Sequence, residues 1–334
     1  MAEREAAIAA FLAASGWGDA KRQPLAGDAS FRRYSRLARG GLTAMLMDAP
    51  PPQEDVRPYL AIARTLRDMG FSAPAILAEE IASGLLLIED FGDDTYTRLL
   101  ARKADEAELY TLAIDVLVAL HRRFAREAAP GLPPYDDTRL LNEAALLVDW
   151  YLPAITGEAT PPDLREGYLD LWRGLFPLAR AVPSSLVLRD YHVDNLMRIK
   201  DRGGLAACGL LDFQDAVLGP VTYDLVSLLE DSRRDIAPDL IASMRQRYLA
   251  AFPELPHAVF DASFAVLGTQ RHCKVIGIFT RLDRRDHKPR YLAHIPRLWR
   301  LIDQNLRHPA LAPVKHWLDR HIPPALRRMP ESRS

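Results

Sequence analysis

Hydrophobic and polar positions in the first part of the chain predict a small sheet. Residues 27–37 begin with turn-forming residues and continue as an alternating pattern, and residues 41–47 form a strand pattern that ends before three prolines. Two further apolar runs, 75–78 and 85–88, flank a polar turn. Because short turns join antiparallel strands, we expect a small, mostly antiparallel sheet built from two hairpins.

Helical periodicity appears twice in the same region. Residues 54–69 carry apolar side chains at helical spacing, and Gly70 is placed to end that helix. Nearer the N-terminus, Ile8, Phe11 and Leu12 fall on one helical face. These patterns predict one helix between the hairpins and a short amphipathic helix packed on the body of the protein.

The pattern changes after Gly92. Helical periodicity then extends over 104–126, 138–152 and 162–180, followed by short apolar runs at 185–188, 196–199 and 205–211 and by helical patterns to the end. We therefore expect an α+β protein of two lobes. Residues 1–92 would form an N-terminal lobe that includes a hinge, and residues 93–334 a larger, mostly helical C-terminal lobe.

Composition narrows the class of partner. The 334 residues include 43 basic and 44 acidic side chains, so no long-range positive field attracts nucleic acid or anionic lipid. The two cysteines, Cys208 and Cys273, lack the spacing of a zinc site or a disulfide framework. No stretch has the length of a membrane span, and Glu3 and Glu5 stand where a signal peptide is basic. We expect a cytoplasmic monomer that binds neither nucleic acid nor membrane.

Two polar clusters, each at the end of an apolar strand, carry the strongest chemical signal. Asp190 and Asn195 follow one strand, and Asp212 follows a later one. Phosphoryl transfer needs a carboxylate near the attacking hydroxyl and hard oxygen ligands for Mg²⁺. A single Asp after a strand is commonly a turn or cap residue, but the three residues in this order favour phosphoryl transfer. We predict that Asp190 is the catalytic base and that Asn195 and Asp212 bind the metal.

These clusters resemble those of a known family. The matching segments are Asp190-x-x-x-x-Asn195, Leu211-Asp212-Phe213-x-Asp215 and Gly219-Pro220-x-x-Tyr223-Asp224-Leu225. They resemble the aminoglycoside phosphotransferase and choline kinase-like superfamily, which shares the bilobal protein-kinase fold. The resemblance implies ATP and Mg²⁺ as cofactors.

The resemblance also assigns roles to individual residues. It implies that the backbone of Glu89 and Phe91 receives adenine at the hinge, although a surface acid is the plain alternative for Glu89. Asp224 fits a helix N-cap locally, whereas the resemblance adds a buried contact to the backbone of the catalytic loop. Asp215 either supports the site or binds metal, and we rank it below Asp212.

A closer resemblance covers nearly the whole chain. Its segments are Gly27-Asp-Ala-Ser30-Phe-Arg-Arg-Tyr34, Met47-Asp-Ala-Pro-Pro, Arg189-Asp190-Tyr-His-x-x-Asn195-Leu-Met and Gly277-Ile-Phe-Thr-Arg281-Leu. They resemble the anomeric N-acetylmuramate/N-acetylglucosamine kinases of peptidoglycan recycling. This implies a sugar substrate phosphorylated on its C1 hydroxyl by ATP, with Ser30, Arg32 and Arg33 at the nucleotide.

The sequence departs from the kinase pattern in two places. Kinases of this fold usually place a lysine on the third strand, but residues 42–47 contain none. Another cation must then bind the phosphates, and Arg32, Arg33 and Arg57 are nearest in sequence; solvated surface arginines are the plain alternative. Leu188 also replaces a histidine that braces the catalytic loop in the family.

The acceptor site is less defined. His192 either contacts the sugar or braces the loop. Glu143 and Trp150 on one predicted helix, and a late basic segment from Gln270 to Lys288 that includes Arg281, are further candidates for the sugar. Core packing is the commoner explanation for Trp150.

Two other functions stay open. One is a kinase of another small hydroxyl compound, such as an aminoglycoside, choline or homoserine, although the basic run 281–290 does not suit a cationic acceptor. The other is a non-catalytic nucleotide-binding regulator, which the missing lysine suggests. Retention of Asp190, Asn195 and Asp212 together argues against a regulator.

Overall fold

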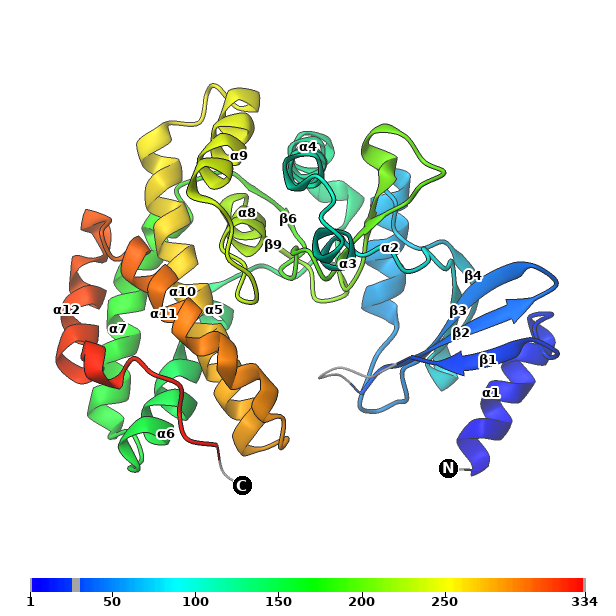
Figure 1. The fold of residues 1–334 in the computed structure, drawn as a ribbon, viewed down its shortest axis with the longest axis horizontal. Coiled ribbons are helices and arrows are strands. Elements are labelled where there is room, and N and C mark those ends of the chain that lie inside the picture. Colours follow the sequence, from blue (N-terminus) through cyan, green and yellow to red (C-terminus); the bar gives the residue numbers. More distant parts are fainter. Residues whose placement is uncertain (1, 26–30, 333–334) are drawn as a thin grey trace. The chain divides into compact units, whose positions relative to one another are not determined.

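Figure 1 shows a computed structural model of the chain, in which residues 2–25 and 31–332 are described. The residues group into two compact units. The first consists of Met1–Val116, Ala125–Pro130 and Val193–Ala216, and the second of Leu117–Phe124, Gly131–His192 and Val217–Ser334. The chain thus passes between the units several times. The single lobe boundary near Gly92 stays a prediction.

A five-stranded antiparallel sheet forms the first unit's framework, in the order β1-β2-β3-β5-β4. The strands are β1 (Lys21–Pro24), β2 (Arg33–Arg39), β3 (Leu42–Asp48), β4 (Ile76–Glu80) and β5 (Leu85–Ile88). Both predicted hairpins are confirmed. The sequence pattern missed β1 because its four residues, Lys-Arg-Gln-Pro, are mostly exposed at the sheet edge and carry no apolar alternation.

Two helices belong to this sheet region. In α1 (Ala2–Ala14), the predicted face of Ile8, Phe11 and Leu12 is buried in a core shared with β2, β3 and β5. The helix α2 (Arg57–Asp68) buries its predicted apolar positions and is followed by Gly70, whose φ of 84° lies in the left-handed region. Both predicted helices are confirmed.

The remainder of the first unit includes the short helix α3 (Tyr96–Ala101) and a two-stranded ladder of β7 (Leu196–Arg198) and β8 (Cys208–Leu210). The predicted strand over 205–211 was wrong in its first half, because a 3₁₀ turn, Gly204–Ala207, precedes β8. The helix α4 (Glu106–Arg123) crosses from the first unit into the second.

Helices dominate the second unit, as expected. They are α5 (Asp137–Leu146), α6 (Leu152–Thr156), α7 (Pro162–Ala179), α8 (Thr222–Leu229), α9 (Pro238–Ala251), α10 (His257–Arg284), α11 (Ile295–Asn305) and α12 (Ala312–His321). Two strands, β6 (Ser184–Val187) and β9 (Val217–Pro220), pair antiparallel. The strand β9 was not predicted. Of the described residues, no helix has the length and apolar character that a membrane crossing requires.

The long helix α10 organises this unit, because α5, α7, α8 and α11 all pack against it (Figure 1). Gly277 permits a close approach of α5: a Cβ atom there would lie 2.3 Å from the backbone carbonyl of Leu146 at the end of α5. The predicted helix over 138–152 is interrupted at this contact by a π-helical turn, Leu147–Tyr151. Such turns are frequent at functional sites.

Candidate active site

Asp190 lies in the loop that follows the buried strand β6. Its backbone N–H donates to the carbonyl of Leu188, at 2.9 Å. The preceding residue, Arg189, has a φ of 70°, a left-handed conformation that costs energy for a side chain with a Cβ. The Asp190 side chain is 39% exposed. The loop therefore presents a carboxylate at the end of a rigid strand.

Two cations on α10 set the charge state of Asp190. Nη2 of Arg271 lies 3.6 Å from Oδ1 of Asp190, and Nη1 of Arg271 donates to the backbone carbonyl of Arg189. Burial raises the pKa of Asp190, but Arg271 and Lys274 outweigh it and hold the pKa at about 2. Asp190 is therefore ionised at neutral pH and is a hydrogen-bond acceptor only.

Asp224 fixes the backbone of the same loop. Its buried carboxylate accepts hydrogen bonds from the N–H groups of Leu188, at 2.6 Å, and Arg189, at 2.9 Å. The resemblance implied this contact, whereas the local N-cap interpretation was wrong: Val221 is at the N-cap, and Asp224 lies inside the first turn of α8. Burial raises the pKa of Asp224 to about 7 against these two donors. Its role in the reaction stays a prediction.

Glu143, a candidate sugar ligand, lies at the centre of a polar network in the second unit. Its carboxylate accepts from Tyr135, from Arg189 and, at 2.9 Å, from Nζ of Lys274. Burial raises the pKa of Glu143, but Lys274 and Arg189 lower it overall. Glu143 thus holds the residue next to Asp190, and contact with a sugar stays a prediction.

The other acceptor candidates differ in burial. His192 is buried, with Nε2 3.5 Å from Nη1 of Arg233, and burial lowers its pKa; this environment favours the bracing role. Trp150 is half-buried within the π-helical turn. Arg281, near the end of α10, is half-buried, and its Nε has no hydrogen-bond partner among the described residues. Burial and the neighbouring Arg285 lower the pKa of Arg281.

The predicted metal ligands belong to the first unit, at one end of the β7–β8 ladder. Asn195 immediately precedes β7. Its backbone carbonyl accepts a hydrogen bond from the backbone N–H of Leu211, at 3.0 Å. Asp212 follows within two residues of the end of β8 and has a φ of 57°. The ladder therefore brings the chain segments of Asn195 and Asp212 side by side. Their convergence with Asp190 stays a prediction.

Two nitrogen donors lie at the carboxylate of Asp212, a residue type that can bind Mg²⁺. Oδ1 of Asp212 accepts from Nε2 of Gln214, at 2.9 Å, and lies 3.3 Å from Nη2 of Arg32. Amide and carboxylate oxygens are the ligands that Mg²⁺ prefers, and Mg²⁺ usually takes only one or two carboxylates besides substrate phosphates. Residues 2–25 and 31–332 contain no cluster of three or more His, Cys, Asp or Glu arranged for a metal.

The predicted phosphate-binding cations have different environments. Arg32 is largely buried beside Asp212 and Glu54, whereas Arg33 begins β2 and is exposed. Arg57 is 73% exposed and pairs with Asp55. Ser30 lies outside the described residues. Arg32 is therefore the member of this set that the structure brings to a predicted metal ligand.

The hinge candidates are tied to their own unit. The backbone N–H of Glu89 donates to the carbonyl of Ala75, at 2.9 Å, so at Glu89 only the backbone carbonyl is left for adenine. The predicted contacts of adenine with the Glu89 carbonyl and the Phe91 backbone stay predictions. The ring of Phe91 lies under the guanidinium of Arg202, 5.3 Å from its centroid, and close to Gly209, where a Cβ atom would come within 2.8 Å of the ring. Asp215 lies 3.2 Å from Nε2 of Gln214.

Sequence reasoning missed the contacts around Asp190. It named the segment beginning at Gln270 for the acceptor but did not connect Arg271 to Asp190, and it did not select Tyr135. Arg271 and Lys274 are three residues apart on α10 and so share a face. That spacing was the available signal.

Comparison with known proteins gives the family. Residues 21–258 match the phosphotransferase enzyme family. The N-acetylmuramate/N-acetylglucosamine kinase of Caulobacter vibrioides is 40% identical, over 98% of this chain and 99% of its own length. The kinase of the same name from Pseudomonas aeruginosa is 38% identical, over 90% and 89% of the respective chains.

Solved structures confirm the fold class. The choline kinase of Streptococcus pneumoniae has a TM-score of 0.58 and covers 92% of this chain and 100% of its own, at 11% identity. A structure with identity this low shows only that the fold is similar. The matches at 40% and 38% identity, which extend over most of both chains, show the family. This chain belongs to the phosphotransferase enzyme family, and the N-acetylmuramate/N-acetylglucosamine kinases are among its relatives.

Proposed function

We propose that this chain is an ATP-dependent kinase that phosphorylates the anomeric hydroxyl of N-acetylmuramate and N-acetylglucosamine in cell-wall recycling. The observation that carries the proposal is the 40% identity, over 98% of the chain, to a kinase that is named for both sugars. The protein acts in the cytoplasm, where both ATP and the amino sugar are substrates. The active form is a monomer with ATP and the sugar as its substrates.

Asp190 is the proposed catalytic base. Its ionised carboxylate accepts a hydrogen bond from the C1 hydroxyl. As the C1 oxygen bonds to the γ-phosphorus of ATP, the bond from that phosphorus to the β-phosphate oxygen breaks, ADP leaves, and Asp190 takes the hydroxyl proton. A carboxylate with a pKa of about 2 is a weak base. Its main contribution is therefore to orient the hydroxyl, with proton transfer late in the reaction. Arg271 keeps the carboxylate ionised and limits its rotation.

Asn195 and Asp212 are the proposed ligands of Mg²⁺. When bound, the ion neutralises charge on the ATP phosphates during transfer. Arg32 is the proposed substitute for the lysine absent from β3. Nη2 of the Arg32 guanidinium lies 3.3 Å from Oδ1 of Asp212, and a guanidinium can also bind the oxygens of a phosphate.

A substrate panel tests the proposal. Purified protein with ATP and Mg²⁺ is offered N-acetylmuramate, N-acetylglucosamine, choline, homoserine and an aminoglycoside, and ADP release is measured for each. We expect turnover with the two amino sugars only. Turnover confined to choline or the aminoglycoside contradicts the sugar assignment, and ATP binding without any turnover contradicts the kinase assignment.

A further inference from the structure

The turn that carries Asp190 is strained. The backbone N–H of Asp190 donates to the carbonyl of Leu188, at 2.9 Å, and the residue between them, Arg189, has a φ of 70°. A hydrogen bond between residues two apart, around a middle residue of positive φ, is the pattern of the strained type of γ-turn. Glycine adopts this φ readily, whereas a residue with a Cβ atom does so at a cost. Other contacts must therefore stabilise Arg189 in this conformation.

Contacts hold both the backbone and the side chain of Arg189. Its N–H donates to Oδ1 of Asp224, at 2.9 Å, and its carbonyl accepts from Nη1 of Arg271, at 3.1 Å. Its guanidinium donates through Nη2 to Oε1 of Glu143 and lies over the ring of Tyr135, 5.8 Å from the ring centroid. The backbone contacts are open to any residue with an N–H group. The contact with Glu143 requires a side chain at position 189.

The carboxylate of Glu143 is fixed by its other partners. The side chain is only 12% exposed, and it accepts further hydrogen bonds from the hydroxyl of Tyr135 and, at 2.9 Å, from Nζ of Lys274. Tyr135 and Lys274 are themselves buried. If Glu143 rotated away from Arg189, buried charges would lose their partners, which is costly. Glu143 is therefore a firm anchor for the Arg189 guanidinium.

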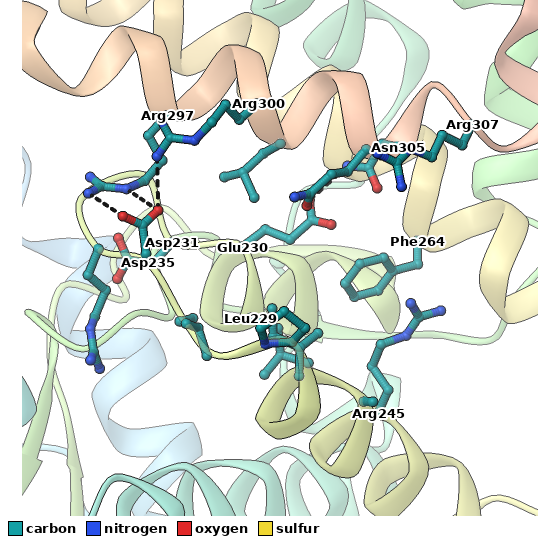
Figure 2. A pocket seen from close by; sticks show the side chains of 17 residues that line it. Leu229, Glu230, Asp231, Asp235, Arg245, Phe264, Arg297, Arg300, Asn305 and Arg307 are labelled. Carbon is teal, nitrogen blue, oxygen red and sulfur yellow. Dashed lines mark hydrogen bonds and ion pairs between the residues drawn. The ribbon is translucent and has the colours of Figure 1, made fainter.

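The helix α10, from which Arg271 reaches the Arg189 carbonyl, is held in place through the next residue. Nε2 of His272 lies 2.6 Å from Oε2 of Glu230, and the same oxygen accepts from Nδ2 of Asn305 on α11, at 2.8 Å. Glu230 and Asn305 line the pocket drawn in Figure 2, where they lie beside each other. Buried networks of this kind hold their members in fixed positions. The carbonyl contact to Arg189 thus comes from a fixed helix.

We propose that Glu143 is a positioning residue for Asp190. Through the guanidinium of Arg189 it holds the strained turn that directs the Asp190 carboxylate at the acceptor hydroxyl. The inference rests on the proposed function, because it takes Asp190 as the base. Asp190 follows the turn directly, so a change of φ at Arg189 moves the carboxylate, and a displacement of about 1 Å at a reacting group can cost about 10²-fold in rate. Glu143 needs no contact with sugar or phosphate for this role.

Two substitutions at position 189 separate the backbone from the side chain. Arg189→Gly and Arg189→Ala remove the same contact with Glu143, but only glycine adopts the positive φ without a steric cost. We expect kcat of Arg189→Gly to be about five- to thirtyfold higher than kcat of Arg189→Ala, in line with that cost. Lys103→Gly and Lys103→Ala form the matched control, because Lys103 has a φ of 62° but is exposed in the first unit. These two should differ in stability and not in kcat.

Substitution of Glu143 tests the anchor. Glu143→Gln keeps the length of the side chain and removes the charge that pairs with Arg189, so we expect kcat to fall at least about tenfold, with the Kd of ATP and of the amino sugar unchanged. Combined with Arg189→Gly, it should lower kcat little further, because the contact through which it acts is already absent. An equal loss of kcat in both backgrounds, or a raised Kd of the sugar in both, would identify a different role and overturn the inference. If Glu143→Gln does not fold, the two variants at position 189 decide.

A measurement without catalysis keeps this inference apart from the proposed function. Hydrogen exchange of the Asp190 amide, followed by NMR, reports its hydrogen bond to Leu188. We expect this amide to be protected in the unsubstituted protein and to exchange at least about tenfold faster in Arg189→Ala and in Glu143→Gln. Equal protection in all of them, or equal kcat of the two variants at position 189, would overturn the inference. The expected exchange pattern in a protein that transfers no phosphate would support the role of Glu143 in the turn and contradict the proposed function.

Discussion

Nη2 of Arg271 on α10 lies 3.6 Å from Oδ1 of Asp190, although the two residues are far apart in sequence. Arg271 is 8% exposed, so this charge is largely shielded from solvent screening. The contact explains how a partly buried carboxylate stays ionised. A residue of α10, which lies outside the loop motif, therefore supplies the cation nearest to the proposed base.

The pH profile of kcat/KM reports this control. Burial raises the pKa of Asp190 and Arg271 lowers it, to about 2 overall, so Asp190 stays ionised throughout the range from pH 5 to 8. Arg271→Gln removes the cation that opposes burial, so the pKa of Asp190 rises. The acidic limb of the kcat/KM profile should then move to higher pH. Arg284→Gln, on the same helix but paired with Asp283, serves as the control. An unmoved acidic limb in Arg271→Gln would contradict the assignment.

Removal of the proposed base has a different signature. Asp190→Asn keeps the shape of the side chain but cannot take a proton, so we expect kcat to fall by about 10²- to 10⁴-fold. The Kd of ATP should not change. Asp194→Asn is the control in the same loop. Its carboxylate accepts a hydrogen bond from Thr97, so we expect kcat to stay close to that of the wild type. Near-normal turnover in Asp190→Asn would exclude Asp190 as the base.

Asp224 gives an unusual pH dependence of stability. Its folded-state pKa, about 7, is above the usual value of 3.8, so the folded state binds more protons than the unfolded state between these limits. Its contribution to stability is present below pH 4 and is lost as pH rises towards 7. In Asp224→Asn the free energy of unfolding, measured with urea from pH 4.5 to 8, should fall less with pH. Identical slopes in wild type and variant would disprove the shift.

Substitution of Arg32 and of Arg57 tests which arginine binds the ATP phosphates in place of the missing lysine. Arg32 lies beside Asp212, whereas Arg57 is exposed and paired with Asp55. We expect Arg32→Gln to raise the KM for MgATP about tenfold or more, the size of a lost charge-assisted contact. Arg57→Gln should have no effect. If the two variants show the same KM as wild type, Arg32 is not the substitute for the missing lysine.

Close packing of α10 makes a prediction about stability. In Gly277→Ala the new Cβ would lie 2.3 Å from the backbone of Leu146, which cannot move without displacing α5, so we expect a loss of about 2 kcal/mol or more. Gly174→Ala, on the exposed face of α7 with no atom within 4 Å, should instead gain roughly 0.5–1 kcal/mol. Urea unfolding of both variants checks the sign and size. An unchanged free energy of unfolding in Gly277→Ala would contradict the close approach of α10 to Leu146.

The parts of the fold that the sequence predicts are those with local signals. The face of Ile8, Phe11 and Leu12 and the helix ended by Gly70 follow from periodicity and from a glycine at positive φ. The edge strand β1 has no such signal, because its pairing with β2 comes from backbone hydrogen bonds and not from an apolar face. The π-helical turn begins next to Leu146, where Gly277 approaches α5, and the local sequence does not signal that tertiary contact.

The candidate site divides in the same way. The loop motif selects Asp190, and the motif two strands later selects Asp212, because both follow local apolar strands. The partners of these residues cannot be predicted locally, since Arg271 and Arg32 reach them through packing of distant segments. Glu143 shows the same limit from the other side, and its contact with a sugar stays a prediction. Its residue type suits a sugar ligand, but the fold surrounds it with Tyr135, Arg189 and Lys274.

The central claim is that phosphate is transferred to the anomeric oxygen of an amino sugar. The most direct measurement is a proton-coupled ³¹P NMR spectrum of the product formed from N-acetylmuramate, ATP and Mg²⁺. The account predicts one new phosphomonoester doublet whose coupling partner, identified by a ³¹P–¹H correlation, is the anomeric proton on C1 and not the proton on C4. A signal coupled to the two protons on C6, or no phosphorylated sugar at all, would contradict the account.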